Sequence, residues 1–241
     1  MPPVTLVRVI GTSPASSAGL FRSLAGRLLN AALPATCPGC GAEGPPLCAS
    51  CAALLHARLG EPPGIPLGMP SDVPLPLLQL EWSAPYSGPV RAALRALKYG
   101  GERRLAEPLG AAVAERWREA GRGGEVLVPV PVHAERRRAR GYDQAVLLAT
   151  VAAGALRLPV AEALERERST VPQFELGRER RADNVRGAFG VRAQAAPVVR
   201  GRWILLVDDV ATTGATLVAC ADALLAAGVV GVSAVTVARE A

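Results

Sequence analysis

The amino-acid sequence predicts an α/β fold: a central, mainly parallel sheet flanked by helices, with a small cysteine-bearing module ahead of it. Two observations predict the sheet. Short apolar segments of strand length alternate with longer ones of helical spacing, and one such strand ends in two acids followed by a loop of small residues. A third observation, two Cys-x-x-C pairs near residue 40, predicts the module. We expect this module within residues 1–59, a Pro-rich connector over 60–89 and the α/β domain over 90–241.

Composition narrows the class of protein. The chain has 241 residues, half of them apolar, which suits one substantial α/β domain with a small appendage and excludes a disordered chain. The segment from residue 20 to 33 contains Arg22 and Arg27, which a signal-peptide core tolerates poorly, so we expect a cytoplasmic protein. The formal net charge is +6, with Lys98 as the only lysine, and this balance favours anionic ligands such as a phosphorylated sugar or a nucleic acid.

The first motif along the chain is the pair of Cys-x-x-C turns. Each turn aims two thiolates at one ion, and the short loop between the turns is typical of a structural zinc site. Two disulfide or redox pairs are the alternative, but cytoplasm keeps thiols reduced and no thioredoxin-like pattern surrounds the cysteines. The expected Zn²⁺ ligands are Cys37, Cys40, Cys48 and Cys51, whereas Cys220 is expected in the core.

The next elements follow from prolines and apolar spacing. Eight prolines between residues 60 and 89 predict a semi-rigid connector that ends in an edge segment near residues 82–86. Helices are predicted over residues 90–99, 104–120 and 142–158, and strands over 125–132, 159–164 and 188–191. A helix that ends near residue 228 and a strand over 229–238 complete the domain.

Two polar segments follow core strands. The first, residues 133–144, is predicted to be a loop, and its arginines could bind a pyrophosphate because ligands gather where parallel strands end. The arginines that carry this prediction are Arg137, Arg138 and Arg140. The second segment, residues 165–187, is long, polar and rich in arginine, as expected of a lid that excludes water from a charged ligand. A solvated charge run and a plain surface excursion are the respective alternatives.

The most informative stretch runs from residue 204 to 216. An apolar strand ends at Asp208 and Asp209, whose carboxylates could accept hydrogen bonds from sugar hydroxyls and hold Mg²⁺ through waters. Small residues and a helix N-terminus then suit a phosphate. The loop residues are Thr212, Thr213, Gly214, Ala215 and Thr216. Receiver domains also have a strand that ends in two aspartates, but the chain ends too soon after this strand, and an ordinary βα turn remains the other alternative.

Several motifs together resemble a known family. The stretch over residues 204–216 is similar to the ribose-phosphate fingerprint of type I phosphoribosyltransferases. Before it, in order, stand the cysteine pairs, LKYGG at 97–101, VPVPVHAERRRARGYDQA at 128–145, and T-x-P-Q with R-x-x-N-V-R-G-A-F from residue 170. This order looks like the ComF family over roughly residues 30–239. One departure is Asp143, where family members usually show asparagine, and it adds negative charge beside the arginine segment.

The resemblance implies a type I phosphoribosyltransferase fold with an N-terminal zinc module and a role with imported single-stranded DNA in natural transformation. The loop after the two acids would then hold the 5-phosphate of phosphoribosyl pyrophosphate, the predicted arginines would neutralise its pyrophosphate, and Mg²⁺ would sit at the catalytic pair Asp208 and Asp209. Type I transferases often pair, so a homodimer is also expected.

Three functions remain open at this point. The chain could be a phosphoribosyltransferase with an unknown acceptor, since binding and preorganised charge would supply most of the catalysis. It could bind phosphoribosyl pyrophosphate as a signal and act as a sensor or adaptor. It could also be a single-stranded-DNA-binding accessory of a DNA-uptake helicase, although scarce aromatic residues leave mainly backbone contacts for DNA.

Overall fold

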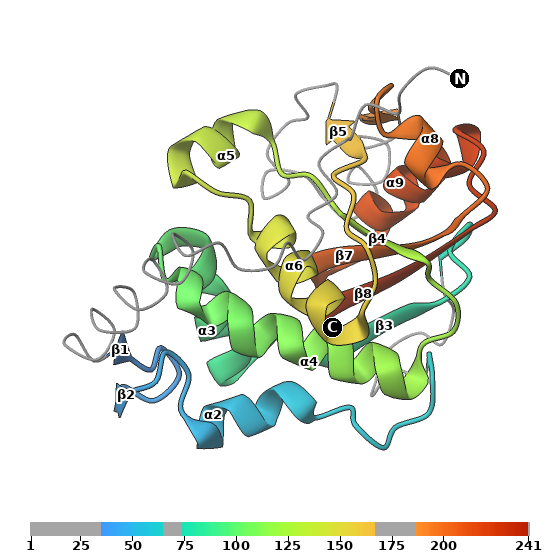
Figure 1. Cartoon of the computed structure of the whole chain (residues 1–241). Helices are drawn as coiled ribbons and strands as arrows, with labels where there is room; N and C mark the ends of the chain where they lie inside the picture. The colour runs from blue at the N-terminus through green and yellow to red at the C-terminus, as the bar shows by residue number, and fades with distance from the viewer. Residues whose placement is uncertain (1–34, 65–73, 167–186, 241) are drawn as a thin grey trace, which may run out of the picture.

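A four-stranded parallel sheet forms the centre of the molecule (Figure 1). The computed structural model describes residues 35–64, 74–166 and 187–240. The strand order is β3 (Leu80–Pro85), β8 (Gly231–Arg239), β7 (Trp203–Ala211) and β4 (Val126–Pro129). The α/β fold predicted from the sequence is therefore confirmed.

Helices cover both faces of the sheet (Figure 1). Apolar residues of α3 (Gly88–Tyr99), α4 (Ala106–Ala120) and α6 (Gln144–Leu156) pack on one face against Leu205 and Val207 of β7. The other face packs against α8 (Ala196–Val199) and α9 (Ala215–Ala226) through Ile204 and Leu206. Both faces of the strand are buried, which explains why it reads as an unbroken apolar run rather than an alternating one.

The register of β7 determines where the sheet opens. β4 pairs with β7 only as far as Val207, whereas β8 accompanies β7 to Ala211. Because Pro129 and Pro131 have no N–H, they cannot donate to a longer ladder with β7. The last residues of β7, which include Asp208 and Asp209, therefore stay in the sheet but lie beyond the end of β4.

The cysteine module packs beneath α3 and α4 (Figure 1). It consists of β1 (Ala35–Thr36), β2 (Glu43–Gly44), α2 (Ala49–Ala53) and a short 3-10 helix, Leu54–His56. Cys37, Cys51 and Leu55 belong to the same apolar cluster as α3 and α4. Gly39 approaches the start of α3 so closely that an added Cβ would lie 2.7 Å from the Cβ of Pro89. The module is therefore fixed to the α/β domain by close packing.

A buried ion cluster joins the module to the sheet. Glu81 on β3, Arg116 on α4 and Arg58 after the module are each 0% exposed. The guanidinium of Arg116 donates to Oε2 of Glu81 at 2.7 and 3.0 Å, and Nη2 of Arg58 lies 3.8 Å from the same oxygen. Oε1 of Glu81 accepts from the backbone N–H of Gly64 and from Nε2 of Gln79, both at 2.7 Å. The carboxylate is thus enclosed by protein donors.

Two predicted elements differ from the structure. Residues 133–144 contain a helix, α5 (Ala134–Arg140), because Ala, Glu and Arg are strong helix formers and Gly141, at φ 74°, ends the helix in the left-handed conformation. Residues 159–164 add only one bridge to the sheet, between Val160 and Leu127. The chain then forms β5 (Leu164–Arg166), which pairs antiparallel with β6 (Phe189–Val191).

The three predicted helices and the edge segment are confirmed. The predicted helices over 90–99, 104–120 and 142–158 correspond to α3, α4 and α6, and the predicted edge segment is β3. The domain boundaries at residues 59 and 89 stay a prediction, and most of the predicted lid, residues 167–186, lies outside the described residues. Within the described part of the chain, no helix combines the length and apolarity that crossing a bilayer requires.

Candidate phosphate and sugar site

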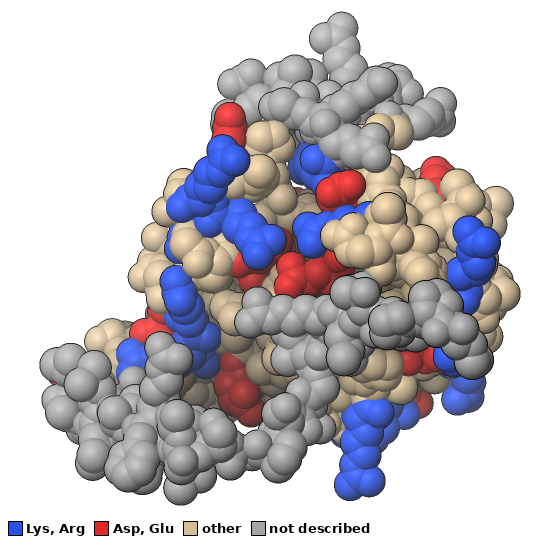
Figure 2. All heavy atoms as spheres, turned by 45° about the horizontal axis from the view of Figure 1, so that its top comes forward, with Lys and Arg blue, Asp and Glu red and all other residues tan. Residues whose placement is uncertain are grey.

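A cavity of about 510 Å³ opens at the carboxyl edge of the sheet. Its walls come from the ends of β4 and β7, the last turn of α3, α5, and the first residues of α6 and α9. Figure 2 shows basic side chains on both sides of a hollow that has acidic side chains at its floor. The acidic lining residues are Asp208, Asp209, Glu135 and Glu240, and the basic ones include Lys98, Arg136, Arg140 and Arg166.

Asp209 is held at the floor by two protein donors. Nζ of Lys98 lies 2.9 Å from its Oδ1, and Nε2 of Gln144 donates to its Oδ2 at 3.0 Å. Burial lowers the pKa of Lys98, but the charge and hydrogen bond of Asp209 outweigh burial and raise that pKa above its ordinary value. Lys98 is therefore held as a cation inside the cavity.

Asp208 has fewer partners. Its Oδ1 accepts the backbone N–H of Asp209 at 2.8 Å. Burial raises the pKa of Asp208 well above its usual range, and the neighbouring Asp209 carboxylate raises it further, while Lys98 lowers it. A carboxylate in this position would be stabilised by a cation or by hydroxyl donors entering the cavity.

The loop between β7 and α9 forms the opposite wall. Gly214 has φ 79°, a left-handed conformation that glycine adopts without strain, and it directly precedes α9. Oγ1 of Thr213 accepts the N–H of Ala215 at 3.4 Å, and Thr213 is not among the residues that line the cavity. Thr212, Gly214, Ala215 and Thr216 do line it. The N-terminus of a helix of 12 residues thus faces the same space as the two acids.

The helical form of α5 separates its arginines. Arg136 and Arg140 are four residues apart, on one face of the helix, and both line the cavity. Arg137 instead lines a second cavity of about 220 Å³, with its Nη1 3.6 Å from Oε2 of Glu162. Arg138 lines neither of these two cavities. Of the three predicted arginines, the structure therefore brings only Arg140 to the acids, and it adds Arg136.

Asp143 has a backbone role. Its Oδ1 accepts the N–H of Ala145 at the start of α6, and its Oδ2 accepts the N–H of Val132 at 3.2 Å. A carboxylate supplies two acceptors for these two donors, and its charge lies at a helix N-terminus, where charge and dipole attract. The departure from asparagine is thus accommodated by hydrogen bonds that join α6 to the segment after β4.

Two residues of the floor were not predicted as site residues. Lys98 appeared in the sequence only as the single lysine and within LKYGG, and that position on a helix end is the signal that could have indicated it. Gln144 carries no such signal, since its contact with Asp209 depends on how α6 packs beside β7. Both contacts join residues far apart in the chain.

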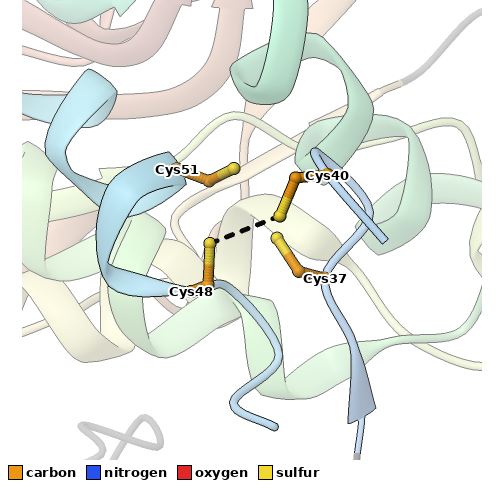
Figure 3. Close-up of side chains that lie close together, drawn as sticks. All are labelled: Cys37, Cys40, Cys48 and Cys51. Carbon is orange, nitrogen blue, oxygen red and sulfur yellow. Dashed lines mark hydrogen bonds between the residues drawn. The ribbon is translucent and has the colours of Figure 1, made fainter. Parts of the chain in front are cut away.

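The four cysteines form a separate cluster (Figure 3). Their Sγ atoms all lie within 4.8 Å of one another, and those of Cys40 and Cys48 are 3.5 Å apart. Zinc–sulfur bonds of about 2.3 Å in a tetrahedron place sulfurs about 3.8 Å apart, so these thiols could hold one structural zinc ion. No disulfide joins the described cysteines, and Cys220 is buried among apolar residues as predicted. None of the four residues lines the larger cavity.

Comparison with known proteins assigns the class. Residues 134–241 match the family model described as "Phosphoribosyl transferase domain". The match assigns a phosphoribosyltransferase domain to this C-terminal part of the chain, which includes β7, α9 and most of the cavity wall. The chain's relatives include YhgH proteins and a competence protein, in line with the ComF resemblance of the sequence motifs.

Individual relatives support this assignment. The chain is 28% identical over 197 residues to the DNA utilization protein YhgH of Salmonella typhi, covering 76% of this chain and 85% of the relative. It is 29% identical over 174 residues to YhgH of Escherichia coli (strain K12), covering 70% of this chain and 75% of the relative. Competence protein F of Haemophilus influenzae is 36% identical over 94 residues, which cover 39% of this chain and 41% of the relative.

Two solved structures match part of the chain at low similarity. The allosteric regulatory enzyme of purine biosynthesis matches 54% of this chain with a TM-score of 0.38 and 21% identity. Glutamine phosphoribosylpyrophosphate amidotransferase from B. subtilis matches 54% with a TM-score of 0.37 and 23% identity. The chain spans about a quarter of the length of each enzyme, 25% in both cases.

Proposed function

We propose that the larger cavity binds phosphoribosyl pyrophosphate together with Mg²⁺. One observation carries the proposal: the acid pair at the end of β7 opens into the same cavity as a helix N-terminus and a wall of basic side chains. The helix N-terminus would suit the phosphate, the acid pair the diol, and the basic wall the pyrophosphate. The match to the phosphoribosyltransferase family supports the same ligand.

Each part of the ligand has a corresponding set of residues. The 5-phosphate would meet backbone N–H groups of the loop over residues 212–216, where the dipole of α9 favours an anion. The ribose hydroxyls would donate to the acid pair Asp208 and Asp209, chiefly to Asp208. Arg140 and Arg136 are better oriented for the pyrophosphate than Arg137 and Arg138, because they line the cavity. A bound Mg²⁺ would neutralise charge on the pyrophosphate beside the acids.

Titration calorimetry with phosphoribosyl pyrophosphate and Mg²⁺ tests the proposal. The wild-type protein should bind, and Asp208→Asn with Asp209→Asn should weaken binding about a hundredfold or more, since several charge-assisted contacts are lost. Arg202→Gln is the control, because Arg202 pairs with Glu125 at the surface and does not line the cavity. Absence of wild-type binding, or equal binding by the double variant, would overturn the proposal.

Transfer of the phosphoribosyl group is a further part of the proposal. In the active form, preorganised cations would stabilise the departing pyrophosphate and the bound geometry would supply most of the rate. Release of pyrophosphate with a base or amine acceptor would demonstrate transfer. Clear ligand binding without release from any acceptor would instead favour a sensor or adaptor that responds to the sugar pyrophosphate.

We also propose a role with DNA, on the strength of the relatives' names. The chain is similar to proteins named for DNA utilization and for competence. With the ComF resemblance of its motifs, this supports work with imported single-stranded DNA, alongside a DNA-uptake helicase in the cytoplasm. The basic side chains that border the hollow in Figure 2 would contact the DNA backbone. Titration of single-stranded DNA at several salt concentrations tests this, because arginine–phosphate contacts require affinity to fall by a slope of about 0.7 per contact. The homodimer stays a prediction.

A further inference from the structure

A continuous chain of side-chain contacts surrounds the floor of the larger cavity. Lys98 contacts Oδ1 of Asp209 at 2.9 Å, and Gln144 donates to Oδ2 of the same carboxylate at 3.0 Å. Gln144 in turn accepts from Nη1 of Arg140 at 2.8 Å through its Oε1. The Arg140 guanidinium lies 5.0 Å from the centre of the Tyr99 ring, next to Lys98 in sequence. Asp209 therefore connects to both cations, to one directly and to the other through an amide.

The two acids of the pair are not equivalent in this arrangement. Both oxygens of Asp209 already accept from protein donors, and the residue is 5% exposed. Asp208 is half-buried, and no donor among the described residues meets its Oδ2. A diol or a hydrated metal entering the cavity would find an available acceptor on Asp208, whereas Asp209 could serve it only by giving up a protein contact.

We propose that Asp209 is a positioning residue that holds Lys98 directly, and Arg140 through Gln144, as the subsite for the pyrophosphate, while Asp208 takes the ribose diol and the metal. This inference rests on the proposed function. It adds two residues, Lys98 and Gln144, to the ligand site, and it separates the tasks of two adjacent acids that look identical in the sequence.

The division has a physical basis. A lysine has a flexible four-carbon stem and loses much rotamer freedom when it binds an anion, so a carboxylate that fixes its ammonium beforehand lowers that cost. Arg140 gains a fixed orientation from the amide of Gln144 and from the face of Tyr99. Gln144 carries no charge, so it orients the guanidinium without neutralising it.

Two ligands separate the tasks: phosphoribosyl pyrophosphate and ribose 5-phosphate, each titrated with Mg²⁺. Lys98→Gln and Asp209→Asn should each weaken binding of the sugar pyrophosphate about tenfold or more and change ribose 5-phosphate affinity less than about twofold. Gln144→Leu should have the same selectivity. Asp208→Asn should weaken both ligands. Arg95→Gln, an exposed cation on the same helix as Lys98, should leave both affinities unchanged.

Further variants distinguish positioning from general effects on the fold or charge. If Asp209 acts through Lys98, the two substitutions should not be additive. The double variant Lys98→Gln with Asp209→Asn should then bind the sugar pyrophosphate less than about threefold more weakly than Lys98→Gln alone. Lys98→Arg, which keeps the cation, should recover most of the affinity, and its thermal unfolding provides a check that the fold is intact.

Three results would overturn the inference. They are equal losses for both ligands in Lys98→Gln, fully additive effects of the two substitutions, and wild-type affinity in Lys98→Gln. A wild-type protein that does not bind the sugar pyrophosphate would instead remove the proposed function on which the inference rests, so the two failures are distinguishable.

Discussion

Two clusters of buried charge in the same sheet have opposite properties. Around Glu81, two arginines face one carboxylate, both carboxylate oxygens accept from the protein, and the cluster is closed to solvent. At the end of β7, one lysine faces two carboxylates, and an oxygen of Asp208 is left for something that enters the cavity. Similar groups are thus arranged in two ways: one cluster uses all its acceptors within the protein, and the other leaves an acceptor that an entering ligand could use.

The closed cluster around Glu81 adjoins the cysteine module, and the largest effect on stability is expected from removing zinc from that module. Arg58 follows the module, and its backbone N–H donates to Ser83 on β3 at 3.3 Å. If the cysteines hold zinc, its removal should lower the free energy of unfolding by more than about 4 kcal/mol, as loss of a structural metal does. Calorimetry before and after chelation, with zinc content by mass spectrometry, checks this.

Cys220→Ala provides the matched control for the metal. Cys220 is buried away from the other cysteines, so this variant should retain one equivalent of zinc, whereas Cys51→Ser should lose it. A protein without bound zinc whose unfolding is unchanged by a chelator would refute the structural role.

Breaking the charge balance of the closed cluster should have the next largest effect. Glu81→Gln keeps the shape of the side chain but leaves Arg58 and Arg116 buried without a carboxylate between them, at a cost of about 3–5 kcal/mol. Glu125→Gln is the matched control, since its pair with Arg202 is exposed and should contribute far less to stability. Denaturant unfolding measures both. Equal costs for the two variants would contradict the distinction between buried and exposed pairs.

Neutralising Asp208, in the cluster at the end of β7, should have the smallest effect on stability. This substitution should raise the free energy of unfolding, whereas the previous two changes lower it. Burial raises the pKa of folded Asp208 above its unfolded value of about 4. Between these two pKa values, the folded protein keeps a proton that the unfolded chain has lost. The contribution of Asp208 to the free energy of unfolding therefore falls as pH rises. Asp208→Asn removes this cost, and should raise stability at pH 7 by about 1 kcal/mol while weakening ligand binding.

The pH dependence distinguishes this gain from a packing effect. The advantage of Asp208→Asn should disappear below about pH 4, where the wild-type carboxyl is protonated in both states. Asp222→Asn, an exposed position on α9, should show no such dependence. Thermal unfolding across this pH range measures both variants, and a gain that persists at low pH would contradict the electrostatic cause.

Local patterns in the sequence predicted the fold and part of the site. The strand, acids and loop over residues 203–216 could be recognised because their order along the chain is also their order in space. Likewise, the cysteine spacing was sufficient to predict a four-thiol cluster. Sequence patterns therefore predict well those features that are formed by residues close together in the chain.

What the sequence could not provide depends on tertiary contacts. Arginines 136 to 140 appear as one charge run, but the helix directs Arg140 to the acids and Arg137 to Glu162. The contact between Lys98 and Asp209 joins the end of α3 to the end of β7, and no periodicity predicts it. Similarly, residues 159–164 resemble a core strand in composition but form only one bridge to the sheet.

The solitary lysine of the chain also makes the cavity chemically addressable. Because Lys98 is the only lysine in 241 residues, an amine-selective reagent has a single side chain to modify, and that side chain lies at the floor of the cavity. Protection from labelling would, in turn, identify ligands in a mixture without any assay of turnover.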